Sequence, residues 1–532
     1  MFQHNPNTAI LNLWGKITPH IKTTFFSSLF IGFLVHAFMM THVLPNHDGL
    51  SLIIHDLGHV VNQGRWFLAY VSGISSPIGM PWVNGLLSIV YIAIAACLVV
   101  SSLKIYHTVY CILVAGLMVS MPSVACLFPY MQSSAPILFA MMLSCLAAFW
   151  ADRYKYGFIL AVVPLTLSLG CYQAFYGVTA GLMIIILIFE ILYNCTSWQK
   201  TFLKSLRFLA SLSAGMIFYF VMVRITMPSS GLTTYQNIDK MGHISFPELL
   251  SRISNAYAFV FQYFLKNERG FHFHPYMAII FAISFFICGV LLVMLCKRQK
   301  IFKQPVKPAL LILLFLLLPL GCNLIFIVGA RVVHDAMIYG VSILLIFLLT
   351  VAASCDLFSE SLGNKYKMAR LQHTFVNISC WFITAAVTAC LYNYFIFSNK
   401  AYLKIYFSYE QAYAQSVSLI SHIQGIDGYT LDKEIVMVGM PYKGMSKGRG
   451  LPELDRVRLT GFIDGDALFS AHPYYMLPKW LNFSNRITHL KNEILNDTEI
   501  EAIMSKMPQY PNSGSIAIIN DKIYVKFSYT PG

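Results

Sequence analysis

The polar segment 44–67 concentrates groups capable of acid–base chemistry in a chain that has few charges. It reads LPNHDGLSLIIHDLGHVVNQGRWF and contains Asp48, Asp56 and Arg65. A carboxylate within hydrogen-bond reach of an acceptor hydroxyl can act as a general base if its pKa lets it accept the proton. Asp48 follows a long apolar run closely, so the end of a helix should fix its position. We therefore predict that Asp48 is the catalytic carboxylate.

The second aspartate of this segment, Asp56, is also a catalytic candidate. It follows Asp48 by eight residues. If residues 49–60 are helical, that spacing is near two turns and places both carboxylates on roughly one face. Helix capping and an ion pair with Arg65 are the alternative roles of Asp56.

The histidines of the segment raise the possibility of a metal site. His55 and His59 have the i,i+4 spacing that presents two ligands on one helix face. However, the HEXXH order is absent, and no acid from a distant segment supplies an obvious third ligand. We predict neither a metal nor another cofactor, and we assign His47, beside Asp48, to substrate binding.

Three arginines suit an anionic ligand. Arg65 lies in GRWF, Arg224 at the end of an apolar run, and Arg331 in GARVVHD. Arginine offers a planar, permanently charged fork to phosphate oxygens. A phosphate bound there could be a leaving group, because neutralising it stabilises the charge that develops during transfer. The alternative is local pairing, of Arg65 with Asp56 and of Arg331 with Asp335.

The composition indicates which elements must position these residues. The chain is 57% apolar and 11% charged, and a soluble protein carries roughly twice that charged fraction. We therefore predict a polytopic α-helical membrane protein with about eleven transmembrane helices. The apolar runs lie at 24–43, 83–102, 108–127, 135–150, 157–171, 175–194, 208–226, 276–295, 309–328, 336–354 and 374–397.

The basic residues predict the orientation of these helices. Sixteen Lys and Arg residues fall on one side of the alternation, and seven on the other side before residue 398. By the positive-inside rule the N-terminus is cytoplasmic, and an odd number of helices places the C-terminal part outside. The net charge of +14 is mostly a topology signal, so we predict no nucleic-acid partner.

The composition changes after residue 397, which divides the chain into two predicted domains. Residues 1–397 form the membrane domain, with long outer loops at 44–82 and 227–276, and residues 398–532 form a small extracytoplasmic α/β domain. The glycine-rich stretch 439–450 lacks the order of a nucleotide-binding loop. The expected elements of this domain are helices at 400–423 and 497–507, a strand at 434–439, and a hairpin at 515–527 around Asn520–Asp521.

The fourth outer loop contains a predicted amphipathic helix at 245–266. Its apolar residues recur at steps of three and four, but polar residues interrupt them too often for a membrane span. Ser245 and Glu248 have the spacing of a capping box. This helix either lies at the outer membrane interface, where it could guide a lipid-tailed substrate, or plugs the bundle.

Several short segments carry a resemblance to a known family. They are, in chain order, NHDGL, GRWF, MPSVACLFPYM with a following helix that ends in ADRYKY, CYQAF, GAR, and a helix followed by EIVMVG. In their order and in the hydropathy around them, the chain resembles the serotype-converting membrane glucosyltransferases of the Gtr type II group. The similarity extends over most of the chain.

The resemblance implies a GT-C-like architecture in the bacterial inner membrane. It also implies a hexosyltransferase that moves a glucosyl group from polyprenyl-phosphate glucose to a lipid-linked or surface glycan, the O-antigen of lipopolysaccharide, on the periplasmic side. Asp48 matches the first-loop acid of the family, Arg65 the arginine of its GR motif, and Tyr172 with Gln173 its YQ turn. The family often has a further acid in the second outer loop, where this chain has Gln132. This departure counts against a two-carboxylate mechanism and places more weight on Asp48.

The expected mechanism combines these groups. The donor's phosphate meets Arg65 and Arg331, its lipid tail lies between helices, and Asp48 deprotonates or orients the acceptor hydroxyl that attacks the anomeric carbon. The C-terminal domain and the fourth loop would bind the acceptor glycan. Candidate stacking and hydrogen-bonding residues there are Tyr474, Tyr475, Trp480 and Asn482.

Three other classes remain open at this stage. A glycolipid transporter or flippase would show an internal repeat and charges deep in the spans, and the sequence shows neither clearly. A non-enzymatic membrane partner would not need acids and arginines on one face. A membrane acyltransferase modifying the same glycan has only the histidine-rich first loop in its favour.

Overall fold

The computed structural model divides the chain into two compact units. The first contains Met1–Thr41, Ile54–Phe128 and Gln132–Asn399, and the second contains His42–Ile53, Pro129–Met131 and Lys400–Gly532. Pieces of two loops that the sequence predicts to be outer loops therefore belong to the second unit. The structure describes residues 5–51, 58–74, 78–193, 197–227, 245–266, 271, 276–328, 333–360, 367–439, 451–462, 476–490 and 498–527.

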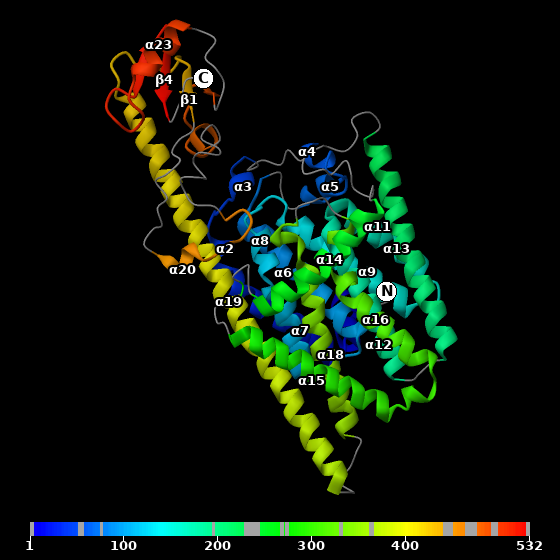
Figure 1. Ribbon diagram of the computed structural model, residues 1–532. Helices are drawn as coiled ribbons and strands as arrows, with labels where there is room; N and C mark the ends of the chain where they lie inside the picture. Colours follow the sequence, from blue (N-terminus) through cyan, green and yellow to red (C-terminus); the bar gives the residue numbers. More distant parts are fainter. Residues whose placement is uncertain are drawn as a thin grey trace. The chain divides into compact units, whose positions relative to one another are not determined.

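The first unit is a helical bundle (Figure 1). Among the described residues, nine helical segments are long and apolar enough to cross a membrane, and Gly157–Cys171 and Val306–Cys322 are two shorter apolar ones. Each corresponds to one of the eleven predicted runs, so the predicted fold class is confirmed. The nine are Pro19–Thr41, Pro81–Ser102, Thr108–Leu127, Ser134–Arg153, Gln173–Leu192, Trp198–Thr226, Tyr276–Arg298, Tyr339–Asp356 and Leu371–Gln424.

The helices of the bundle have the following bounds. They are α1 (Pro6–Lys16), α2 (Pro19–Thr41), α4 (Gly58–Val61), α5 (Leu68–Ser72), α6 (Pro81–Ser102), α7 (Thr108–Ser120), α8 (Pro122–Leu127), α9 (Ser134–Arg153), α10 (Gly157–Leu160), α11 (Val162–Cys171), η1 (Gln173–Phe175), α12 (Tyr176–Leu192), α13 (Trp198–Thr226), α14 (Phe246–Phe261), η3 (Gln262–Lys266), α15 (Tyr276–Arg298), η4 (Ile301–Lys303), α16 (Val306–Cys322), α17 (Ile325–Val328), η5 (Asp335–Met337), η6 (Tyr339–Val341) and α18 (Ser342–Glu360).

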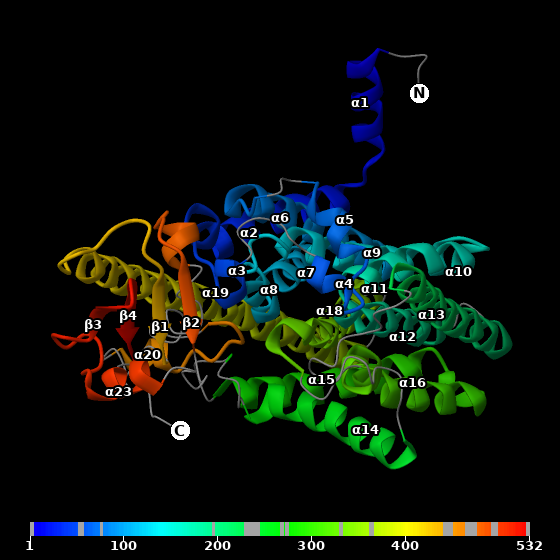
Figure 2. The ribbon, with the colours of Figure 1, turned by 90° about the horizontal axis from the view of Figure 1, so that it is seen from above.

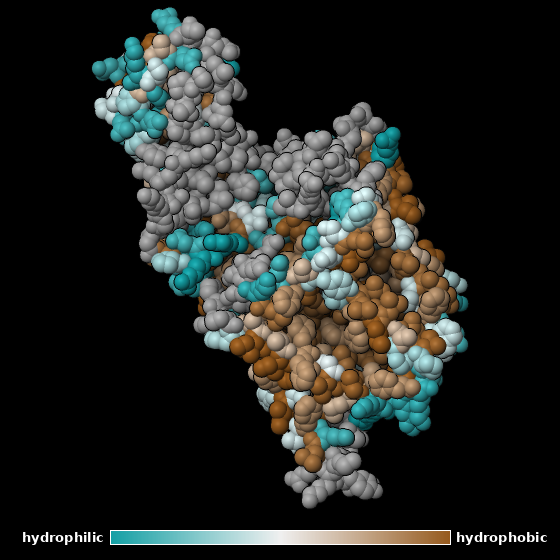
Figure 3. Space-filling view, in the orientation of Figure 1, coloured by the Kyte–Doolittle hydropathy of each residue, from teal (hydrophilic) through white to brown (hydrophobic). Residues whose placement is uncertain are grey.

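Large apolar side chains are exposed on the surface of this bundle. Phe30 on α2, Ile217 on α13 and Phe286 on α15 are more than half exposed. Figure 3 shows such side chains spread over the outside of the helices. A surface of this kind is unfavourable in water and suited to lipid. Together with the helix lengths, it shows that the chain is a membrane protein.

One helix is much longer than predicted. The expected helices at 374–397 and 400–423 form a single helix, α19 (Lys367–Gln424). No proline or glycine occurs between residues 367 and 424, and Gly425 follows directly. Because these two residue types are the usual helix breakers, nothing local interrupts α19 before its end.

The second unit contains a four-stranded sheet with the order β2-β1-β4-β3 (Figure 2). Strand β1 (Ile435–Val438) is parallel to β2 (Ile487–Leu490) and to β4 (Lys522–Lys526), and β3 (Ile516–Ile519) is antiparallel to β4. Asn520 and Asp521 both have positive φ, as a two-residue hairpin of type I′ requires. The hairpin, the first strand and the helix α23 (Thr498–Lys506) are as predicted. The unit also contains α3 (His47–Ser51), α20 (Pro452–Asp455) and η7 (Met476–Trp480).

The predicted amphipathic helix is present as α14 and η3, but its predicted capping box is not formed. Ser245 precedes α14 without a side-chain cap hydrogen bond. Glu248 pairs instead with Arg252, one turn later, at 2.8 Å. Arg252 also donates to the Ile327 carbonyl at 2.7 Å, which ties α14 to α17. The location of α14 at a membrane interface stays a prediction.

Candidate functional site

The GRWF segment is held against the turn that joins α11 to η1. The Phe67 N–H donates to the Gly170 carbonyl at 2.8 Å. A Cβ on Gly170 would lie 2.6 Å from the ring of the buried Trp66, so only glycine lets the ring approach the backbone this closely. Two sequence motifs more than 100 residues apart thus form one structure.

Within this structure, Arg65 lies over the ring of Tyr172. Its guanidinium carbon is 5.2 Å from the ring centre, inside the range of a cation–π interaction. Tyr172 is buried. Burial raises the pKa of its phenol, and the charge of Arg65 offsets only part of that rise. Tyr172 is therefore neutral at physiological pH and does not itself neutralise the positive charge of Arg65.

Arg65 also keeps an unused hydrogen-bond donor. Its Nε atom is buried and has no hydrogen-bond partner among the described residues. A buried donor without a partner is unfavourable by about 1–3 kcal/mol, so a ligand oxygen at this position would be stabilising. An anion fits both the charge and the free donor.

Gln173 connects three segments beside this arginine. Its Nε2 donates to the Gln63 carbonyl at 3.2 Å and to the Tyr219 hydroxyl at 3.0 Å. These bonds join the first outer loop, the turn and α13. Gln173 and Tyr219 also line a small pocket whose other walls are mostly apolar. The remaining lining residues are Leu169, Tyr176, Met216, Leu324, Ile325 and Val328.

The predicted catalytic residue, Asp48, lies in the second unit. It occupies the first turn of α3 and is half-buried. Helix α2 ends at Thr41, and the intervening residues 42–46 are not helical. Asp48 is therefore mounted on a short helix of its own, and the expectation that the end of the first span fixes its position is wrong.

The other predicted site residues are distributed as follows. Arg224 is exposed in the last turn of α13, and the described contacts of Arg65, Tyr172 and Gln173 do not include it. The backbone of His47 belongs to α3, but its side chain lies outside what the structure describes. Asp56 and Arg331 lie outside the described residues altogether.

The sequence did not reveal two residues of this region. Tyr219 is fully buried at the Gln173 amide, and an aromatic residue within a span gives no sign of such a role. Asp335, considered only as a partner of Arg331, is 5% exposed in η5. Burial raises the pKa of the Tyr263 phenol, and the negative charge of the Asp335 carboxylate adds to the rise. The sequence signal that could have singled out Asp335 is an acidic residue directly before an apolar run, in a chain with few acids.

Within the part of the chain that the structure describes, no group of three or more His, Cys, Asp or Glu side chains could hold a metal ion. The side chains of His47, His55, Asp56 and His59 lie outside that part. The chemistry of the described site is that of a cation, aromatic rings and an amide.

Comparison with known proteins identifies the family. No curated protein matches the chain. The family model of the glucosyl transferase GtrII matches residues 37–349, which is more than half of the chain. The match includes Asp48, Arg65, Tyr172 and Gln173 and ends before the sheet of the second unit. The predicted resemblance is confirmed, and the chain belongs to the GtrII family of glucosyl transferases.

Proposed function

We propose that this glucosyl transferase uses polyprenyl-phosphate glucose as donor and a surface glycan, the O-antigen or its lipid-linked precursor, as acceptor. The family match supports glucosyl transfer as the reaction. The apolar helices indicate that the protein lies in a membrane. The observation that carries the donor assignment is Arg65, which combines a charge that Tyr172 does not neutralise with a buried Nε that has no partner among the described residues. A polyprenyl phosphate is an anion held at a membrane surface, and its phosphate oxygens could accept a hydrogen bond from the guanidinium of Arg65.

The two ends of the bundle support reaction at one membrane face. Lys204 pairs with Asp152 at 2.5 Å and with Glu190 at 2.6 Å. Gln173 precedes Glu190 by 17 residues through η1 and α12, a rise of about 25 Å. The hydrocarbon core of a bilayer is about 30 Å thick. The Gln173 region and the Lys204 cluster therefore suit opposite faces of the membrane.

The distribution of basic residues supports an assignment of the cytoplasmic and periplasmic faces. The side that holds Lys204 has the excess of Lys and Arg, so the positive-inside rule makes it cytoplasmic. Arg65 and Gln173 then face the periplasm of a bacterial inner membrane. In this orientation the N-terminus is cytoplasmic and the C-terminal unit is periplasmic.

The proposed reaction is a substitution at the anomeric carbon of the donor. The acceptor hydroxyl oxygen forms a bond to that carbon, the bond from the carbon to the phosphate oxygen breaks, and polyprenyl phosphate leaves with the electron pair. Asp48 takes the proton of the acceptor hydroxyl. Arg65 binds the phosphate and stabilises the negative charge that it gains.

The pocket beside Gln173 has a cavity volume of about 20 Å³, which is too small to hold an isoprenoid unit. The polar groups of Gln173 and Tyr219 lie at the same place. We propose that Gln173 orients the head of the donor next to Arg65.

The test is a reconstituted assay with the full-length protein in lipid vesicles. Polyprenyl-phosphate glucose and a glycan acceptor are added, and free polyprenyl phosphate and glucosylated glycan are both measured. The proposal expects equal amounts of the two products. Movement of intact glycolipid across the bilayer without cleavage would indicate a transporter. Modification of the glycan by an acyl group would indicate an acyltransferase.

A further inference from the structure

We propose that the C-terminal part of the second unit holds α3, and therefore Asp48, in its working position, with Trp480 as the positioning residue. The inference rests on the proposed role of Asp48. It assigns a task within the reaction to a region beyond residue 349, where the family match ends.

Helix α3 needs such support because it is too short to be stable alone. It has five residues, and the first turn of a helix is unfavourable until further hydrogen bonds follow. The position of Asp48 must therefore come from tertiary contacts of its neighbours in the chain. The structure shows contacts on both sides of it.

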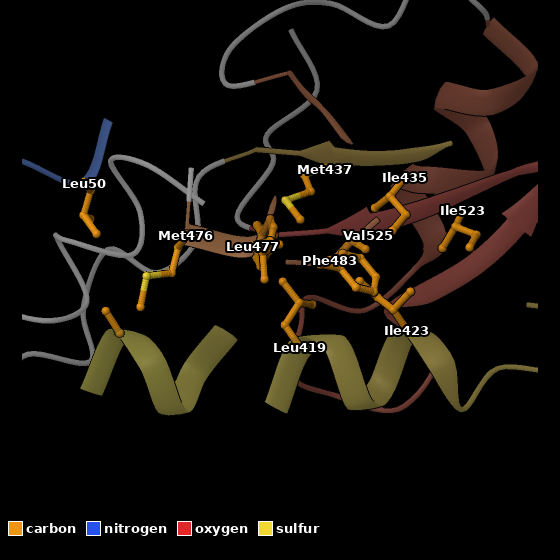
Figure 4. Close-up of a cluster of buried hydrophobic side chains, with 12 residues drawn as sticks. Leu50, Leu419, Ile423, Ile435, Met437, Met476, Leu477, Phe483, Ile523 and Val525 are labelled. Carbon is orange, nitrogen blue, oxygen red and sulfur yellow. The ribbon is translucent and has the colours of Figure 1, made fainter. Parts of the chain in front are cut away.

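The first contact is the burial of Leu50, two residues after Asp48. Leu50 is completely buried in a hydrophobic cluster with residues from α19, η7 and the sheet. Figure 4 shows Leu50 and Met476 at one end of this cluster, which continues through Leu477 to Phe483 and the strands. The apolar core of the second unit thus includes a side chain from the first outer loop.

The second contact is a hydrogen bond to the last turn of α3. The Trp480 indole N–H donates to the Leu50 carbonyl at 3.0 Å. This carbonyl is among those that a helix of this length cannot satisfy itself. The ring of Trp480 in turn packs edge-on against Tyr409 of α19, with ring centres 5.7 Å apart. Trp480 therefore links α3 to the part of α19 that belongs to the second unit.

The start of α3 is held separately. The buried Asn46 side chain accepts the Gly49 N–H at 2.8 Å, the usual N-cap arrangement. The Asn46 N–H donates to the Pro129 carbonyl at 3.4 Å. A Cβ on Gly49 would lie 2.9 Å from that same carbonyl oxygen. Asp48 thus lies between an N-cap tied to the second outer loop and a carbonyl held by Trp480.

The contacts at both ends of α3 lead to a specific prediction about kcat and KM. Loss of the indole N–H should let α3 shift while Arg65, in the other unit, keeps its own contacts. A displacement of about 1 Å at a catalytic group can lower the rate roughly 100-fold. We expect Trp480→Phe to lower kcat 10- to 100-fold with little change in the KM for polyprenyl-phosphate glucose. A merely structural role would instead reduce the amount of folded protein and leave the kcat of the folded fraction unchanged.

The experiment measures kcat, KM and thermal unfolding of full-length variants in vesicles. Trp381→Phe is the matched control, because Trp381 is an exposed tryptophan on α19, and it should behave as wild type. Asn46→Ala tests the other end of α3 without altering the C-terminal core, and Asn46→Ser, which keeps a side-chain acceptor, should restore most of the lost kcat. Wild-type kcat in Trp480→Phe would overturn the inference, whatever the result with Asn46→Ala.

Asp48→Asn and the double variant Asp48→Asn/Trp480→Phe separate this inference from the proposed function. If Asp48→Asn keeps full activity, the proposed role of Asp48 fails, and the inference fails with it. If Asp48→Asn is inactive while Trp480→Phe is fully active, only the inference fails. If both single variants lose activity and the double variant is no worse than Asp48→Asn, Trp480 acts through Asp48.

Discussion

Arg65 lies with its guanidinium carbon 5.2 Å from the centre of the Tyr172 ring, and its buried Nε has no partner among the described residues. The ring holds the cation in place without neutralising it, because burial keeps the phenol protonated. A carboxylate in the place of Tyr172 would have cancelled the charge. The arrangement is therefore suited to bind an anion that arrives and leaves, as a phosphate leaving group does.

Removal of the Arg65 side chain should impair both binding and chemistry. We expect Arg65→Ala to lower kcat/KM for polyprenyl-phosphate glucose roughly 100- to 1,000-fold, the usual effect of losing one charge-stabilising group. Arg65→Lys should recover only part of this, since an ammonium lacks the planar fork. Arg456→Ala, at an exposed arginine of the second unit, is the control and should leave kcat/KM unchanged. Equal activity of Arg65→Ala and Arg456→Ala would remove Arg65 from the site.

The ring of Tyr172 should matter more than its hydroxyl. Tyr172→Phe keeps a face for the guanidinium, so we expect near wild-type kcat/KM. Tyr172→Leu loses the cation–π contribution of about 0.5–2 kcal/mol, which corresponds to roughly a 2- to 30-fold loss. Steady-state kinetics on the two variants provide the comparison. Equal losses in both would assign the effect to the hydroxyl.

Gly170 should tolerate no side chain. A methyl group there meets the Trp66 ring at 2.6 Å, and overpacking of this kind destabilises a protein by about 1–3 kcal/mol. Gly170→Ala should therefore lower the Tm in detergent and reduce transfer together. Gly289→Ala on α15 is the control, because a Cβ there has no atom within 4 Å and alanine favours a helix. A Gly170→Ala protein as stable as Gly289→Ala would contradict the close approach of Trp66.

The second unit should lose stability in acid through Glu434. The hydrogen bond from Lys522 lowers the pKa of its carboxyl, and the bond from Thr488 contributes further. A carboxyl with a depressed pKa in the folded state stabilises the fold above its unfolded pKa, about 4.3, and this stabilisation is lost as the pH falls through the folded pKa. Unfolding followed from pH 6 to pH 3 should show a smaller acid-dependent loss in Glu434→Gln than in wild type. Identical pH profiles would exclude this linkage.

Much of the fold could be predicted from local patterns. The eleven apolar runs, the hairpin at Asn520–Asp521 and the strand before Gly439 depend on residue types within a few positions. Strand β2 was missed because its four residues, Ile487–Leu490, show no clear alternation and form a strand only beside β1. The capping box at Ser245 failed because Glu248 has a better partner in Arg252.

The contacts of the candidate site could not be predicted from the sequence, because they join distant parts of the chain. Arg65 and the YQ turn were each predicted as site residues, but the stacking of Arg65 on Tyr172 joins residues 107 positions apart. Periodicity carries no information about such a pair. The same reason applies to Asp48, whose short helix depends on Trp480, more than 400 residues later in the chain.

The most direct test of the account is glucosyl transfer by Asp48→Asn in the vesicle assay, with Asp427→Asn, at an exposed aspartate of the second unit, as control. If Asp48 accepts the proton of the acceptor hydroxyl, Asp48→Asn should insert normally into the membrane and lose roughly 100- to 10,000-fold in kcat, while Asp427→Asn remains active. Transfer at the wild-type rate by correctly inserted Asp48→Asn would contradict the proposed mechanism.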